Sequence, residues 1–165
     1  MNETIDVTVD LVNASTDTQL PATEAFTRWT RAALDALHRD TDAELSIRVV
    51  DEAESATLNS TYRHKSGPTN VLSFPYAAMA GMDNSEIPLL GDLAICAPLV
   101  RQEAEAQQKT VEAHWAHLTV HGVLHLNGMD HEEAEDAAAM ESLEIHILDT
   151  LGFANPYQLD DIGNE

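Results

Sequence analysis

Residues 121–131 read HGVLHLNGMDH, a stretch that places three histidines around a glycine turn. On a helix, His121 and His125 are one turn apart and project from the same face, so both imidazoles can reach one cation. Gly128 is the residue type expected just past a helix end, where it lets the chain fold back. His131 can then supply a third nitrogen from another direction. The spacing therefore predicts a site for one zinc ion (Zn2+) with an open fourth position for water.

Two further histidines precede this stretch on the same helix face. His114 lies two turns and His117 one turn before His121, too far along the helix axis to complete the same ligand set. They either line the pocket and support the ligands, or they are simply packed. The His121 and His125 pair alone would indicate surface or packing residues on an amphipathic helix. The glycine turn and His131 favour a metal-binding site instead.

The spacing also matches the zinc ligands of metzincin peptidases, which carry a glutamate directly after the first histidine as general base. Gly122 stands at that position here. Peptide hydrolysis would therefore need a base from elsewhere, and Asp92 and Asp130 are the candidates that the sequence offers. A zinc metallopeptidase stays an alternative.

The rest of the chain alternates between strand and helix periods. Period-two alternation predicts strands at residues 5–11 and 45–50, and the motifs and turn signals predict two more at 71–76 and 90–97, with a mobile loop at 77–89. Helical spacing predicts helices at 21–40 and from Glu132 to Leu151, and more weakly in the segment through Tyr62. Pro98 suits the first turn of a helix at 98–107, and residues 111–127 contain no Pro or Gly except Gly122, which predicts a further helix. We therefore expect an α+β fold. It comprises a single domain (residues 1–165), with a small mixed four-stranded sheet, about five helices and the zinc site on a metzincin-like helix-turn.

Charge and hydropathy exclude other classes of protein. The 165 residues include 8 Lys and Arg against 29 Asp and Glu, a net charge of -21. This excludes a basic protein that coats nucleic acid but leaves room for RNA contact at a small local site. The longest apolar run, residues 93–100, is too short to span a bilayer, and no basic residue precedes Arg28. We therefore expect no membrane segment and a cytosolic protein, with the lone Cys96 as a small buried hydrophobe.

A second motif region lies upstream. Arg63, His64 and Lys65 form a short basic run, which alone is more often a solvated surface than a site. Together with residues 121–131, however, the sequence resembles the bacterial endoribonuclease YbeY family. The resemblance rests on Tyr62-Arg63, PTNVLSFP at 68–75, LGD at 90–92, HGVLHLNGMDH at 121–131 and LGFANPY at 151–157, and it runs from about residue 45 to 157. Met129 stands where tyrosine is common, and Asn70 where aspartate is common.

The resemblance implies a function and a set of site residues. His121, His125 and His131 would hold zinc, and Arg63 would be the essential cationic residue of the cleft, unless it merely pairs with a carboxylate to hold its loop. The implied activity is that of a zinc-dependent, single-strand-specific endoribonuclease in rRNA processing. It would mature the 3′ end of small-subunit 16S rRNA and act in late-stage ribosome quality control.

The same resemblance implies partners and a compartment. The expected partners are ribosomal RNA, the small ribosomal subunit, a ribosomal protein and the GTPase Era, in the bacterial cytoplasm. Residues 110–165 contain twelve acidic residues and no Lys or Arg, so we expect weak binding to naked RNA. A non-catalytic ribosome assembly factor stays a further alternative, and it would show a fourth protein ligand at the metal.

Overall fold

The strands and helices follow the order that the periodicities predict. The computed structural model describes residues 5–76, 89–129 and 134–157. The strands are β1 (Val7–Asn13), β2 (Ala43–Val50), β3 (Val71–Pro75) and β4 (Leu89–Cys96). Within the described residues, the helices are α1 (Thr23–Ala36), α2 (Glu52–Arg63), α4 (Ala97–Ala106), α5 (Val111–Leu126) and α6 (Ala134–Thr150). The predicted α+β fold of a single domain with a four-stranded mixed sheet and five helices is confirmed.

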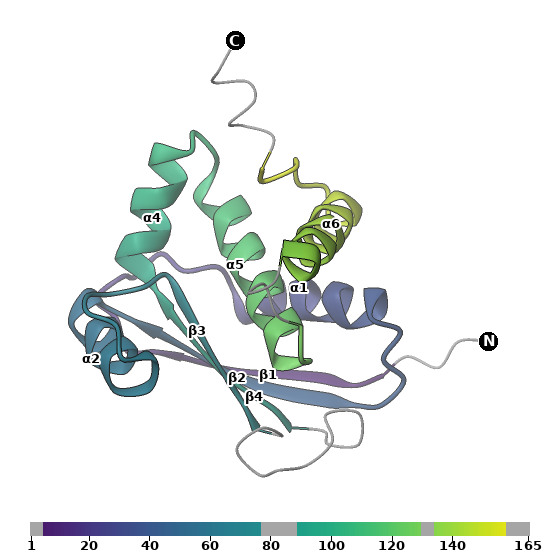
Figure 1. Cartoon of the computed structure of the whole chain (residues 1–165), viewed down its shortest axis with the longest axis horizontal. Coiled ribbons are helices and arrows are strands. Elements are labelled where there is room, and N and C mark those ends of the chain that lie inside the picture. Colours follow the sequence, from purple (N-terminus) through teal and green to yellow (C-terminus); the bar gives the residue numbers. More distant parts are fainter. Residues whose placement is uncertain (1–4, 77–88, 130–133, 158–165) are drawn as a thin grey trace.

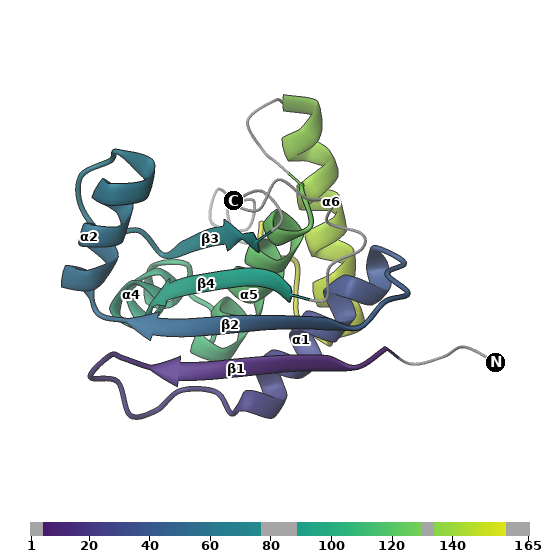
Figure 2. The ribbon, with the colours of Figure 1, turned by 90° about the horizontal axis from the view of Figure 1, so that it is seen from below.

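The sheet has the strand order β1-β2-β4-β3. Strands β1, β2 and β4 are parallel to one another, and β3 runs antiparallel to β4 at one edge. Helix α1 connects β1 to β2, as parallel neighbours require a crossover. Helices α1, α4, α5 and α6 lie on one side of the sheet, whereas α2 lies apart, beside the end of β3 and β4 (Figure 1). Figure 2 views the strands from the side that these four helices leave open.

Alternation along the strands decides which side chains meet the helices. On β2, Leu45 and Ile47 are buried beneath α1 and α5, while Arg48 is exposed on the opposite face. The helices contribute aromatic side chains to the same core. The Phe26 ring lies edge-on to Trp29 and Trp115, with ring centroids 5.2 and 5.7 Å apart. This core fixes α5 across the sheet, and α5 carries four of the clustered histidines.

Several expectations can be compared with the structure directly. Helix α1 ends at Ala36 rather than near Asp40, because His38 adopts a left-handed φ of 59° and the backbone turns there. Cys96 is fully buried, as predicted, and burial raises the pKa of its thiol. The predicted loop at 77–89 and the helix start at Glu132 fall almost entirely outside the described residues. Among the described helices, none has the length and apolarity to cross a membrane.

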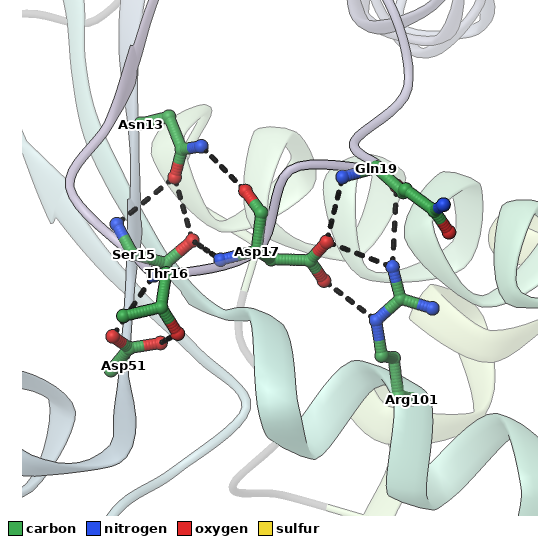
Figure 3. A network of polar contacts seen from close by, with 7 residues as sticks. All are labelled: Asn13, Ser15, Thr16, Asp17, Gln19, Asp51 and Arg101. Carbon is green, nitrogen blue, oxygen red and sulfur yellow. Dashed lines mark hydrogen bonds and ion pairs between the residues drawn. The ribbon is translucent and has the colours of Figure 1, made fainter.

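Polar contacts hold the connection between β1 and α1 against the rest of the molecule (Figure 3). Arg101 of α4 donates from Nε and Nη2 to the two carboxylate oxygens of Asp17, at 2.6 and 2.8 Å. The backbone N–H of Thr16 donates to Asp51 at the start of α2. A segment without regular structure is thereby attached to two helices at once.

Candidate functional site

A cavity of about 220 Å³ lies between the end of α2, strand β3 and helix α5. It brings together residues from both motif regions of the sequence, although they lie about sixty positions apart. The described residues that line it are Asn59, Arg63, Lys65, Thr69, Asn70, Val71, Leu72, Ser73, His121 and His125. No carboxylate is among them. This cavity is therefore locally cationic in a chain whose net charge is -21.

The first two predicted zinc ligands converge in this cavity. His121 and His125 lie one turn apart on α5, and their Nε2 atoms are 3.1 Å apart. Two nitrogens bound at 2.0–2.1 Å to one tetrahedral zinc ion would lie roughly 3.3 Å apart, so the pair fits a shared cation. The helix ends as predicted: Gly128 has a φ of 93°, and its N–H donates to the carbonyl of His125. His131 lies outside the described residues, which hold two of the three predicted ligands and no complete group of three.

A buried carboxylate orients the first of these histidines. Glu144 of α6 is fully buried and accepts a hydrogen bond from Nδ1 of His121 at 2.6 Å. It also accepts hydrogen bonds from Nε2 of His117 at 2.9 Å and from the hydroxyl of Tyr157 at 2.5 Å. Burial by itself would raise the pKa of Glu144, but the hydrogen bonds from His117 and His121 outweigh it and lower the pKa to about 2.

The contact with Glu144 decides which ring nitrogen of His121 donates. A carboxylate can only accept, so His121 donates through Nδ1, and in the neutral ring Nε2 keeps its lone pair on the side of His125. A carboxylate behind a ligating histidine in this way is the usual second-layer support of a protein zinc site. Glu144 lies outside the sequence motifs that indicate the site. The available signal was its position on the apolar stripe of α6, four residues after Met140 and three before Ile147.

The two earlier histidines of α5 have different environments. His117 contacts Glu144, so it supports the carboxylate that orients His121. Burial lowers the pKa of His117, which favours the neutral ring that donates to this carboxylate. His114 instead contacts Glu103 of α4 at 2.7 Å, and Glu103 also accepts from Asn70 at 3.0 Å. Neither histidine lines the cavity among the described side chains.

The structure places Arg63 in the same cavity as the two histidines. Arg63 is the last residue of α2, and the left-handed φ of 58° at His64 ends the helix there. Lys65 follows and lines the cavity as well. Neither cation forms an ion pair with a carboxylate in the part of the chain that the structure describes. The alternative in which Arg63 pairs with an acidic residue to hold its loop is therefore not observed.

Neutral side chains hold that loop instead. The Ser55 hydroxyl donates to the carbonyl of Thr69 at 2.8 Å and accepts from the N–H of the same residue at 2.9 Å. The Asn59 amide donates to the carbonyl of Gly67 at 2.9 Å. Both Ser55 and Asn59 are buried on α2. The described contacts that hold the loop therefore do not involve the side chains of Arg63 and Lys65.

Gly122, which stands where the peptidases carry their glutamate base, packs closely against the sheet. A Cβ at Gly122 would come within 2.7 Å of the Leu93 side chain on β4, so this position faces the sheet and not the cavity. Asp92, one of the two candidate bases, is exposed and lines a different groove. Asp130 lies outside the described residues. The described part of the cavity therefore offers no carboxylate base for peptide hydrolysis.

Comparison with known proteins agrees with the motifs that meet in the cavity. A sequence model of the family described as Endoribonuclease YbeY matches residues 10–152. The chain belongs to the YbeY family. The Endoribonuclease YbeY of Methylococcus capsulatus (strain Bath) is 55% identical to it over 154 residues, which make up 93% of this chain and 96% of that protein.

A solved structure shares the fold. The solution structure of TM1509 from Thermotoga maritima covers 86% of this chain and 87% of its own, with a TM-score of 0.57 and 22% sequence identity. The YbeY match spans Arg63, His121, His125 and His131. Membership of the YbeY family supports an RNA-cleaving hydrolase, and the predicted resemblance is confirmed.

Proposed function

We propose that this protein is a zinc-dependent, single-strand-specific endoribonuclease. The observation that carries the proposal is the single cavity that holds His121 and His125 together with the cations Arg63 and Lys65. Phosphodiester cleavage needs stabilisation of charge on the phosphate oxygens and a source of an activated nucleophile. The cavity contains residues suited to both tasks.

His121, His125 and His131 would hold the zinc ion. When bound, zinc supplies Lewis-acid stabilisation of the phosphate and lowers the pKa of water toward neutrality. Arg63 binds the scissile phosphate, because a guanidinium can donate paired hydrogen bonds to two of its oxygens. Lys65 adds a second positive charge to the same cavity. Glu144 keeps His121 oriented by accepting a hydrogen bond from its Nδ1.

The biological setting is part of the same proposal. The substrate is the 3′ end of small-subunit 16S rRNA, and the protein also acts in late-stage ribosome quality control. The partners are the small ribosomal subunit, a ribosomal protein and the GTPase Era, in the bacterial cytoplasm. The acidic surface supports this setting, because a partner or particle must then deliver the RNA that free diffusion would not.

The two alternative functions have less support. A metallopeptidase lacks a base in the described cavity, as Gly122 faces Leu93. A non-catalytic assembly factor would close the zinc site with a fourth protein ligand, and beyond His121 and His125 the described lining contains no further His, Cys, Asp or Glu.

The proposal is tested by cleavage of single-stranded RNA with metal-stripped and zinc-reloaded protein, together with Arg63→Glu. We expect zinc to restore cleavage, and Arg63→Glu to lower kcat/KM by about 10²- to 10³-fold while zinc content and melting temperature stay unchanged. Arg28→Glu is the matched control, because Arg28 is an exposed arginine on α1 outside this cavity. Equal activity of the two variants would contradict the role of Arg63.

A further inference from the structure

A second groove lies on the opposite side of the sheet, between α2 and the strands. Its volume is about 380 Å³, which is sufficient for a small planar ligand. Tyr62 of α2, Phe74 of β3 and Asp92 of β4 line it. Phe74 and Asp92 are paired in register, whereas the side chains of the next pair along, Ser73 and Leu93, contact Gly122 of α5. Each of the motifs at 62–63, 68–75 and 90–92 thus places one side chain here that the candidate site does not use.

The groove carries an exposed aromatic surface. Tyr62 is 61% exposed, although its ring lies edge-on to Phe74 with centroids 5.1 Å apart. Among the described residues, the large hydrophobic side chains with high exposure are Val12, Tyr62 and Tyr76, and the first two both line this groove. Aromatic side chains held in this way stack on unpaired nucleobases, and each such stack strengthens binding about 5- to 100-fold.

The charges in the groove favour a base over a phosphate. Arg48 is neutralised by Glu54 at 2.6 Å, which leaves no unpaired cation among the described lining residues. Asp92 is exposed, and none of the described residues forms a hydrogen bond or ion pair with its carboxylate. A free carboxylate repels a phosphate but accepts hydrogen bonds from the N–H groups of a base edge.

The groove and the candidate site are neighbours on the same two elements. Tyr62 directly precedes Arg63 on α2, and Phe74 directly follows Ser73 on β3. In each pair, one residue lines the groove and the other lines the cavity with the histidines. A strand with a phosphate at Arg63 can therefore place a nearby base across the end of α2, next to Tyr62.

We propose that this groove binds one unpaired nucleobase of the RNA strand whose phosphate lies at Arg63, with the base stacked on Tyr62. The inference rests on the proposed function and adds a physical basis for single-strand specificity. A base can stack on a protein side chain only after it has left the helical stack of a duplex.

The test compares Tyr62→Ala with Tyr62→Phe on short single-stranded RNAs that carry one abasic nucleotide, moved through the sequence. We expect Tyr62→Ala to raise KM and the dissociation constant about 5- to 100-fold, and Tyr62→Phe to behave as the native protein. When the abasic nucleotide replaces the base that stacks on Tyr62, the native protein should lose the same amount of RNA affinity. Tyr62→Ala should cause no further loss of affinity for that RNA. Tyr76→Ala is the control, because Tyr76 is also exposed but lies outside the described groove.

Binding and cleavage together separate this inference from the proposed function. If the native protein cleaves no RNA, the proposed function is wrong, and the binding measurement still decides the base site. If RNA is cleaved while Tyr62→Ala binds as the native protein, or its effect adds to that of every abasic position, the base site is wrong. Melting curves establish that Tyr62→Ala is folded, as expected for a side chain exposed to this extent.

Discussion

A buried carboxylate is costly unless its oxygens are fully used, and Glu144 meets this condition through three hydrogen bonds. One of them reaches His121, whose Nε2 lies 3.1 Å from that of His125. The orientation of His121 toward His125 therefore depends on a residue of another helix, which itself does not line the cavity.

We expect Glu144→Gln to weaken zinc binding about 10- to 100-fold, because an amide supports the His121 N–H less strongly than a carboxylate does. The unfolding free energy should fall by about 1–3 kcal/mol, since one side of the amide cannot accept from the neighbouring donors. Competition with a chromogenic chelator measures the first effect, and urea unfolding measures the second.

Glu103→Gln provides the control for this prediction. Glu103 also contacts a histidine of α5, but that histidine is His114, which forms no hydrogen bond with Glu144 or with the proposed zinc ligands. We expect a loss of stability with unchanged zinc affinity. If both variants bound zinc as the native protein does, the supporting role of Glu144 would be refuted.

These residues also show what the sequence can predict. The convergence of His121 and His125 could be predicted because both residues lie on one helix and their spacing is local. Glu144 could not, because it lies 23 positions from His121 and meets it only through the packing of α6 on α5. Likewise, the motif containing Arg63 predicted a cation near the proposed metal site, but only the fold shows that Arg63 and the two histidines line one cavity.

At the scale of the elements, periodicity was sufficient for the order of strands and helices but not for their relative orientation. The apolar spacing in the first helix predicted its burial, and α1 and α5 both supply aromatic residues to the core. The packing of Gly122 against Leu93 depends on how closely α5 approaches the sheet. No local sequence pattern predicts this distance between the helix and the sheet. The early end of α1 was not predicted, because a histidine with a left-handed φ, as at His38, has no strong sequence signal.

The attachment of the β1–α1 connection to α4 gives a prediction at this scale. Hydrogen bonds from Arg101 lower the pKa of Asp17 below its ordinary value of 3.8. Burial acts in the opposite direction but has a smaller effect. A lowered folded-state pKa contributes stability above the unfolded value, and this contribution is lost as the pH falls through the folded value. The Asp17–Arg101 pair therefore stabilises the protein at neutral pH, and its contribution begins to fade as the pH falls below about 4.

We expect Arg101→Gln to lower the unfolding free energy by about 1 kcal/mol at pH 7, with the difference from the native protein shrinking toward pH 3. Urea unfolding at a series of pH values measures this. Arg48→Gln serves for comparison, because the Arg48–Glu54 pair is more exposed and should contribute less. A difference for Arg101→Gln that stayed constant from pH 7 to pH 3 would contradict the assignment to Asp17.

For the molecule as a whole, the distribution of charge limits how RNA can approach. The net charge of -21 opposes a polyanion, while Arg63 and Lys65 are the cations that line the described part of the cavity. Two phosphate contacts to a single strand predict a slope of log K against log salt of only about -1.4. Binding through so few contacts is weak, and the surrounding field weakens it further.

We therefore expect small ribosomal subunits to compete with labelled single-stranded RNA far better than an equal concentration of unlabelled RNA does, at physiological salt. A particle can contribute protein surfaces whose contacts do not require positive charge on this chain, and it holds the RNA end at a high effective concentration near the cavity. Fluorescence anisotropy with both competitors, repeated over a range of salt concentrations, measures the affinities and the slope together. Equal competition by particles and free RNA, or a slope steeper than about -3, would show that this protein binds RNA through a larger cationic surface than the described structure contains.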